Sequence, residues 1–311
     1  MTTRRNFFAG AAALGLLGGC GTLGTCAGRR KDYSYDPRRG LQLAWPELSR
    51  PVHLKVLTDT HLGLVDARDE AHADHYRRMK QWPGNPQAFH KALAKAQEEK
   101  PDLLLLTGDN ISFPTLANVE FLHRELEACG LPYLYVAGNH DWHFEGDGGT
   151  DLEQRDRWIA ARLKPLYQGA NPLMASRLVN GVRVVAIDNS AYHILPEQVD
   201  FWKAEAAKGD PLVLAMHIPF WQPGWGVTTC ACPTWGAATD PYWQIEQRQR
   251  WDEKLNSATF AFREAVMATP NLVAVLAGHI HHFQAARDHG QNLFTAPANS
   301  KGEVLDVTIG G

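Results

Sequence analysis

"LVAVLAGHIHHF", residues 272–283, joins an apolar run to a cluster of three histidines. A run of this length is typical of a buried β-strand, and the glycine permits a turn where that strand ends. Neutral imidazole is the commonest side-chain ligand for transition metals, so His279 and His281 are candidate metal ligands, with His282 a bystander. The chain contains 14 histidines, so a chance cluster is the alternative interpretation of this stretch alone.

The same kind of apolar run recurs along the chain. Between several of these runs lie segments with apolar residues three and four positions apart, which predict helices. Strands and helices that alternate indicate an α/β fold with sheets buried on both faces, and residues 51–311 are expected to form one domain. A final stretch of strands and turns, 283–309, predicts antiparallel pairs. The six predicted strands are Val52–Leu57, Leu103–Thr107, Tyr133–Ala137, Val182–Ile187, Leu212–Met216 and Leu272–Ala277.

Polar side chains that can bind a metal follow five of these predicted strands. In open α/β sheets, ligands bind beyond the carboxyl ends of the strands, where the loops converge. Residues i and i+2 of an extended chain share a side, so the D-x-H and H-x-H pairs can each point at one centre. The candidate ligands are Asp59, His61, Asp109, Asn139, His217, His279 and His281, with His140 and Asp141 beside them.

Seven oxygen and nitrogen donors without a thiolate are too many for one ion that must also bind a substrate. Two divalent or trivalent metal ions that share a bridging carboxylate can use them all, and such donors suit Fe, Mn, Zn or Co. The alternative is that each aspartate caps a helix or closes a turn and each histidine is an ordinary core residue. Five coincidences at strand ends make that alternative the weaker one.

The ordered set D-x-H, G-D-x, G-N-H-D, H, G-H-x-H, from Asp59 to His281, resembles the calcineurin-like metallophosphoesterase superfamily. The resemblance implies two mixed β-sheets packed face to face and flanked by helices, in four αββα layers. It also implies that His140 contacts the phosphate or protonates the leaving oxygen, and that Asp141 orients His140. It assigns one metal ion to Asp59, His61, Asp109 and His281, and the other to Asp109, Asn139, His217 and His279.

The resemblance implies hydrolysis of phosphodiesters or phosphomonoesters by attack of a metal-bridging hydroxide. Ser112 stands where purple acid phosphatases have a tyrosine, and Asp141 replaces their glutamate, so the motifs are closer to cyclic-nucleotide and glycerophosphodiester phosphodiesterases. A non-catalytic binding protein on the same fold and a nuclease are the alternatives. The net charge of −3 and the lack of a basic run in the predicted domain make nucleic acid an unlikely partner.

The first residues, "MTTRRNFFAGAAALGLLGGC", resemble a bacterial export signal. Arg4 and Arg5 precede an apolar stretch too short to span a bilayer, which indicates a signal peptide over residues 1–19 and the twin-arginine export machinery as a partner. Leu17–Cys20 resembles a lipobox, which implies a lipid anchor at Cys20 and a membrane-anchored protein of the periplasm or cell envelope. Cleavage at another small residue and an uncleaved anchor are the alternatives. Residues 20–50 are expected to form a tether.

A tryptophan-rich loop is expected over residues 219–245, directly after His217. Trp221 and Trp225 are candidate substrate-binding residues because flat rings stack on nucleobases, although packing of the loop onto the domain is the alternative. Cys230 and Cys232 form either a disulfide or two free thiols. A second insertion, residues 62–87, has no role that the sequence assigns.

Overall fold

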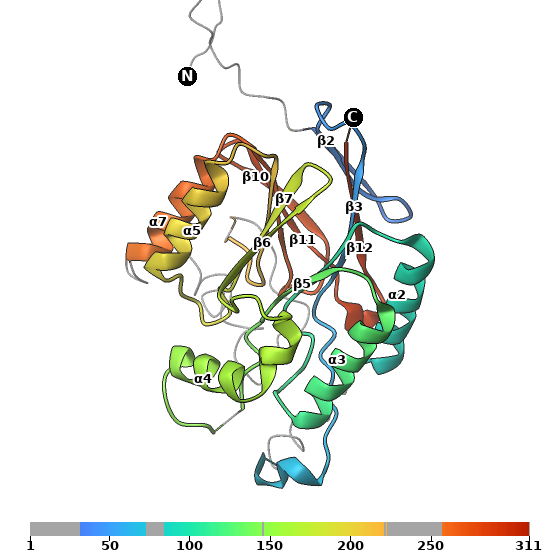
Figure 1. Cartoon of the computed structure of the whole chain (residues 1–311), viewed down its shortest axis with the longest axis vertical. Helices are drawn as coiled ribbons and strands as arrows, with labels where there is room; N and C mark the ends of the chain where they lie inside the picture. Colours follow the sequence, from blue (N-terminus) through green and yellow to red (C-terminus); the bar gives the residue numbers. More distant parts are fainter. Residues whose placement is uncertain (1–31, 73–83, 145, 221, 223–256, 311) are drawn as a thin grey trace, which may run out of the picture. The chain divides into compact units, whose positions relative to one another are not determined.

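The computed structural model describes residues 32–72, 84–144, 146–220, 222 and 257–310. Within them, two six-stranded sheets run in the orders β1-β2-β12-β3-β4-β5 and β10-β11-β9-β8-β7-β6 (Figure 1). The strands of the first sheet are β1 (Tyr33–Asp36), β2 (Gly40–Ala44), β3 (Val52–Leu57), β4 (Leu103–Thr107), β5 (Tyr133–Val136) and β12 (Leu305–Gly310). Those of the second are β6 (Met174–Val179), β7 (Val182–Ile187), β8 (Leu212–Ala215), β9 (Leu272–Ala277), β10 (Gln284–Asp288) and β11 (Gln291–Thr295).

Both sheets are mixed, with parallel strands at their centres. Strands β3, β4 and β5 are parallel to one another, as are β7, β8, β9 and β11. The pairs β10–β11, β6–β7 and β12–β3 are antiparallel, which confirms the antiparallel pairs predicted for the end of the chain. Because parallel neighbours end at the same edge of a sheet, the loops after β3, β4 and β5 lie together, and so do those after β8 and β9.

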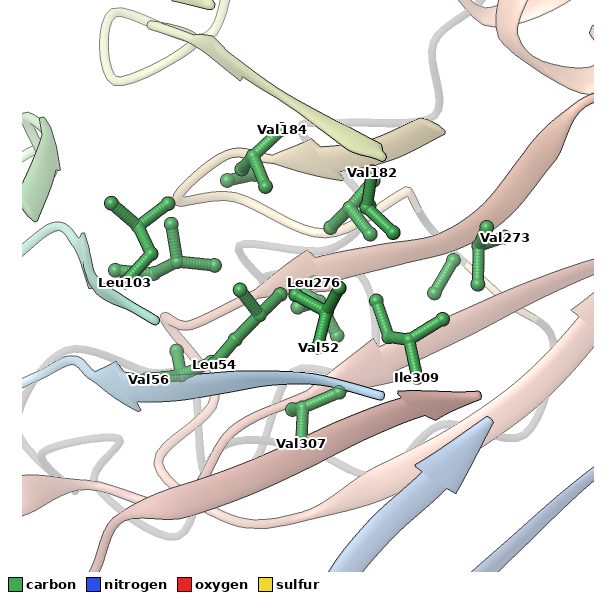
Figure 2. Close-up of a cluster of buried hydrophobic side chains, with 14 of the residues drawn as sticks. Val52, Leu54, Val56, Leu103, Val182, Val184, Val273, Leu276, Val307 and Ile309 are labelled. Atoms are coloured by element: carbon green, nitrogen blue, oxygen red, sulfur yellow. The ribbon is translucent and has the colours of Figure 1, made fainter. Parts of the chain in front are cut away.

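A core of branched aliphatic side chains fills the space between the two sheets (Figure 2). Val52 and Leu54 of β3 face Val182 and Val184 of β7 across this layer. Residues in a strand alternate between the two faces, so Leu103 and Leu105 join this core while Leu104 and Leu106 pack under the helices. Burial on both faces explains why β4 is apolar at all but its last position.

Helices cover the outer face of each sheet. Helices α2 (Pro86–Glu99) and α3 (Leu116–Cys129) cover the first sheet, and α5 (Pro196–Ala206) and α7 (Ser257–Met267) cover the second (Figure 1). Helix α4 (Asp151–Trp158) and the short helices η1 (Ala67–His72), η2 (Ile159–Leu163), η3 (Lys164–Tyr167) and η5 (Asn299–Lys301) complete the set of the described residues. The α/β architecture of two mixed sheets with flanking helices is confirmed. No helix in the described ranges is both long and apolar enough to cross a membrane.

Part of the expected tether is folded, which corrects the prediction for residues 33–44. Strand β2 pairs in parallel with β12, and Leu41 and Leu43 are buried in the core between the sheets. The sequence does not reveal this because β2 is short and its partner lies at the other end of the chain. The predicted signal peptide 1–19 and the rest of the tether up to residue 31 lie outside the described residues.

The described part of the insertion 62–87 docks on the start of α3. The backbone N–H of Leu64 donates to Asn118 Oδ1 at 2.7 Å, and Thr115 Oγ1 donates to the carbonyl of Leu64 at 2.6 Å. Buried Asp69 accepts the N–H of Leu116, in the first turn of α3, and the guanidinium of Arg162. The beginning of the insertion is therefore part of the packed domain.

Candidate metal centre

The candidate ligands follow β3, β4, β5, β8 and β9, and the structure brings six of the seven together where these strands end. Asp59, His61 and His281 form one group, called here the first group, in which the ligand atoms lie within 4.8 Å of one another. Asp109, His217 and His279 form the second group, by the same measure. Six residues separated by up to 222 positions in the sequence thus form two compact sets of metal-binding atoms.

Asp109 lies where it can serve both groups. Its Oδ2 is 3.2 Å from Nε2 of His217 in the second group and 3.9 Å from Nε2 of His61 in the first. A third set of three residues, which consists of His61, Asp109 and His140, overlaps both groups. A carboxylate in this position can bridge two cations.

Five of the candidate ligands have a backbone conformation that non-glycine residues rarely adopt. Their φ angles are 51° for Asp59, 52° for His61, 50° for Asp109, 73° for His279 and 59° for His281. Left-handed residues of this kind cost free energy and concentrate at functional sites, where the surrounding structure holds them. The left-handed conformation at the strand ends accompanies the convergence of these side chains in the two groups.

Hydrogen bonds to backbone groups and to Thr58 fix the orientation of the ligands. Nδ1 of His217 lies 2.7 Å from the carbonyl oxygen of Thr107, so this nitrogen carries the proton and Nε2 faces Asp109. Asp59 Oδ2 accepts from Thr58 Oγ1 at 2.8 Å and from the backbone N–H of His279 at 2.9 Å. These bonds leave Oδ1 of Asp59 facing Nε2 of His281 at 3.1 Å.

Asp141 has different partners from those expected. Its carboxylate accepts backbone N–H groups of Gly138 at 2.6 Å and of Asp109 and Ile111 at 2.9 Å each. Among the described residues, these contacts are with the loop after β4 and with its own loop, and none is with the imidazole of His140. Burial, followed by the charge of Asp109, raises the pKa of Asp141 to about 7. Asp141 therefore holds the backbone of Asp109 and Ile111, and its role in orienting His140 stays a prediction.

His140 is partly exposed, as is Asn139 before it, whereas the other six candidate ligands are buried. Its backbone N–H donates to Asp109 Oδ1 at 2.8 Å, and its ring centroid lies 5.0 Å from that of His61. The side chain therefore lies at the edge of the two groups, where a substrate can reach it.

Ser112, which takes the place of the tyrosine of purple acid phosphatases, donates to the carbonyl of His61 at 3.0 Å.

The residues present fit metal ions better than they fit one another. The Nε2 atoms of His61 and His281 face each other at 3.1 Å, as do His217 Nε2 and His279 Nδ1. Burial lowers the pKa of His61 to about 3, so its ring is neutral and can bind a metal. Among the described residues, Nε2 of His279 and Oδ1 of Asn139 are buried without a hydrogen-bond partner. Oxygen and nitrogen donors in this arrangement suit two metal ions of the Fe, Mn, Zn or Co type.

Several sequence-based assignments fall on other parts of the chain. Trp221, Trp225, Cys20, Cys230 and Cys232 all lie outside the described residues. His282 belongs to neither group and contacts Gln284. Six of the seven candidate ligands and His140 belong to the three groups, whereas the assignment of Asn139 as a ligand and the substrate-binding and lipid-attachment assignments remain predictions.

A substitution at Gly138 tests how tightly the centre is packed. A Cβ atom at this position would collide with Oδ1 and the backbone nitrogen of Asp109. We expect Gly138→Ala to displace Asp109 and to lower the metal content of the purified protein, measured by plasma mass spectrometry. Gly148→Ala is the control, because a Cβ there meets no atom within 4 Å. Equal metal content in the two variants would contradict this account of the packing.

Comparisons with known proteins identify the family. The model of the family described as calcineurin-like phosphoesterase matches residues 52–283. A probable cyclic nucleotide phosphodiesterase of Psychrobacter sp. (strain PRwf-1) is 23% identical over 224 residues, which cover 69% of this chain and 57% of the relative. Another probable cyclic nucleotide phosphodiesterase, from Moraxella catarrhalis (strain BBH18), is 41% identical over 61 residues, which cover 19% of this chain and 22% of the relative.

A solved structure shares the fold. The purple acid phosphatase PPD1 from seeds of yellow lupin (Lupinus luteus) superposes with a TM-score of 0.50 and 10% identity, over 87% of this chain and 56% of that one. This likeness concerns the fold alone. The family match spans every candidate ligand from Asp59 to His281. The chain therefore belongs to the calcineurin-like phosphoesterase family, whose members are metal-dependent phosphoester hydrolases.

Proposed function

We propose that this chain is a phosphodiesterase that hydrolyses cyclic nucleotides with two bound metal ions. The observation that carries the proposal is the position of Asp109, which lies within reach of histidines of both groups. The proposed ligands of the first ion are Asp59, His61, Asp109 and His281, and those of the second are Asp109, Asn139, His217 and His279.

Each part of the centre has a role in this proposal. When bound, two metal ions at such a site supply Lewis-acid polarisation of the phosphoryl oxygens and activation of water. His140 contacts the phosphate or donates a proton to the leaving oxygen, since it is the partly exposed member of its set. Asp141 keeps Asp109 in place through the backbone of the loop after β4.

The choice of a cyclic phosphodiester rests on two supports. Both curated relatives reported above are named as probable cyclic nucleotide phosphodiesterases, although this chain spans only 57% and 22% of their lengths. Ser112 and Asp141 depart from the pattern of purple acid phosphatases, and Ser112 hydrogen-bonds to the backbone of His61. We further propose that Trp221 and Trp225 stack on the base of the substrate.

A substrate panel tests the proposal. The purified protein, with its metal content measured, is assayed against 3′,5′-cyclic AMP and GMP, glycerophosphocholine, p-nitrophenyl phosphate and single-stranded DNA. We expect the highest kcat/KM for a cyclic nucleotide. A preference for the monoester would contradict the assignment as a diesterase, and cleavage of DNA would favour the nuclease. A protein that binds two metal ions and cleaves none of these esters would favour a non-catalytic binding protein.

Export and anchoring make a separate prediction. We propose that Arg4 and Arg5 direct the chain to the twin-arginine machinery and that Cys20 carries a lipid anchor to the cell envelope. Replacement of both arginines by lysine is expected to retain the protein in the cytoplasm, and Cys20→Ala is expected to release it from the membrane fraction. Fractionation of a bacterial host followed by immunoblotting measures both. Identical fractionation of wild type and Cys20→Ala would remove the lipid anchor and leave the enzymatic proposal intact.

A further inference from the structure

The turn Asp188–Ser190, directly after β7, supplies no candidate ligand but contacts two of the loops that do. Oδ1 of Asn189 accepts the backbone N–H groups of His217 at 3.2 Å and of Ile218 at 3.1 Å. Nδ2 of Asn189 donates to the carbonyl oxygen of Ile218 at 2.7 Å. One amide side chain thus holds the backbone on both sides of the His217–Ile218 peptide.

These bonds complete the immobilisation of His217. Its carbonyl oxygen accepts the N–H of Gly278, at 2.9 Å, and its Nδ1 faces the carbonyl oxygen of Thr107. Asn189 supplies the remaining anchor, at the backbone N–H. His217 therefore has its ring, its carbonyl and its N–H held by three different loops, of which the loop at Asn189 is the one that contains no candidate ligand.

The neighbouring Ser190 holds the loop that contains Asn139 and His140. Its Oγ donates to Asp188 Oδ1 at 2.6 Å, and this directs a lone pair toward Nε1 of Trp142, which donates to it at 2.8 Å. The backbone N–H of Ser190 also donates to Asp188 Oδ1, at 2.8 Å. Trp142 is itself 2% exposed, so this contact fixes a bulky side chain three residues after Asn139.

Solvent does not compete for these hydrogen bonds. The exposed fractions of Asp188, Asn189 and Ser190 are 1%, 1% and 0%. Buried hydrogen bonds that cannot be replaced by bonds to water are the ones whose loss displaces the groups they hold. The turn therefore connects the ligand loop after β5, in the first sheet, with the ligand loop after β8, in the second sheet.

We propose that Asn189 and Ser190 are positioning residues for the second of the two metal ions. Asn189 sets the position of His217, and Ser190 sets that of the loop with Asn139, so the turn fixes the distance between two ligands contributed by different sheets. This inference rests on the proposed two-metal function. Residues that orient metal ligands from outside typically contribute about 10–100-fold in metal affinity.

The test measures retention of metal, with Asn189→Ala and Ser190→Ala as the two variants. Each purified protein is dialysed against a graded series of EDTA concentrations, and the metal ions that remain per chain are counted by plasma mass spectrometry. We expect both variants to lose one ion at an EDTA concentration about 10–100-fold lower than wild type does, while the other ion stays. Asn189→Asp keeps the accepting oxygen and is expected to lie closer to wild type than Asn189→Ala.

A control separates positioning from general stability. Gln291 is also buried, and its side-chain amide donates to the carbonyls of Met267 at 2.9 Å and Thr269 at 2.8 Å. Gln291→Ala removes a comparable pair of buried bonds and is expected to lower the melting temperature while retaining both metal ions. If Asn189→Ala does not fold, Ser190→Ala decides, because it changes only one oxygen atom.

The outcomes for the two proposals are distinct. The positioning role would be overturned if the variants at Asn189 and Ser190 fold and retain both ions as wild type does. This conclusion does not depend on which substrate the enzyme hydrolyses. The positioning role would also be overturned if the variants at Asn189 and Ser190 lost both ions together and Gln291→Ala lost both ions as well, because the loss would then follow general destabilisation. A wild-type protein that holds two ions but cleaves no phosphoester would contradict the proposed function and leave the retention experiment valid.

Discussion

Asp109→Asn is expected to abolish hydrolysis of the best substrate and to remove metal from the protein. The substitution keeps the size of the side chain but takes away the negative charge between the two groups, where Oδ2 lies 3.2 Å from His217 and 3.9 Å from His61. Without the negative charge of the Asp109 carboxylate between them, two bound cations would repel each other and bind less tightly. Loss of metal-based stabilisation worth several kcal/mol corresponds to a fall of about 10³-fold or more in kcat/KM.

The matched control for this prediction is Asp102→Asn. Asp102 lies directly before β4, at the opposite end of the strand from Asp109, and accepts the backbone N–H of His53 at 2.9 Å. Both variants replace a carboxylate by an amide beside the same strand. Metal content and turnover are expected to stay near wild type in Asp102→Asn. An Asp109→Asn protein with two ions per chain and near-normal kcat would refute the bridging assignment.

His140→Gln is expected to lower kcat for cyclic nucleotides by about 10²–10⁴-fold while the metal content stays at the wild-type level. His140 lies at the edge of the two groups and is assigned to the substrate rather than to a metal ion. A proton donor increases the rate most when the leaving group is a strongly basic alkoxide, as it is in a cyclic nucleotide. The leaving group of bis(p-nitrophenyl) phosphate is stable without a proton. The kcat of His140→Gln for this ester is therefore expected to fall much less.

The comparison of the two substrates distinguishes this role from a structural one. Misfolding or loss of metal would lower the turnover of both esters by the same factor. His282→Gln is the control, since His282 is adjacent to a candidate ligand but contacts Gln284. Equal losses on the alkyl and aryl esters in His140→Gln would contradict proton donation and leave a contact with the phosphate as the role of His140.

The strained backbone at the ligands has a thermodynamic consequence. Five left-handed residues, each costing of order 1–3 kcal/mol, are held by the packed sheets and by the hydrogen bonds of the loops. The conformation is the one in which the ligand atoms of each group lie within 4.8 Å of one another. The same packing accounts for the glycine before Asp109. Gly108 has a φ of 89°, and a Cβ atom there would lie 2.5 Å from Nδ1 of His217, so a larger residue would displace this ligand.

Local patterns in the sequence determined the strands and the candidate ligands. Apolar runs predicted β3, β4, β7 and β9 with the observed bounds, because strands buried on both faces are rich in apolar residues, even though β3 and β7 include His53, Lys55 and Arg183. Polar residues after these runs predicted the ligand loops, since parallel strands end at a common edge. Both signals depend on residues that are close together in the chain.

Only the tertiary structure decided the features that depend on distant partners. The sequence predicts a tether where β2 lies, because the burial of β2 depends on β12, more than 260 residues away. The sequence does not reveal that the carboxylate of Asp141 holds the backbone of Asp109 and Ile111, about 30 residues earlier in the chain. Asn189 and Ser190 look like an ordinary polar turn until the fold places them against His217 and Trp142. Hydrogen bonds between loops of different strands leave no periodic trace in a sequence, so side chains that support a site are found only when the chain is folded.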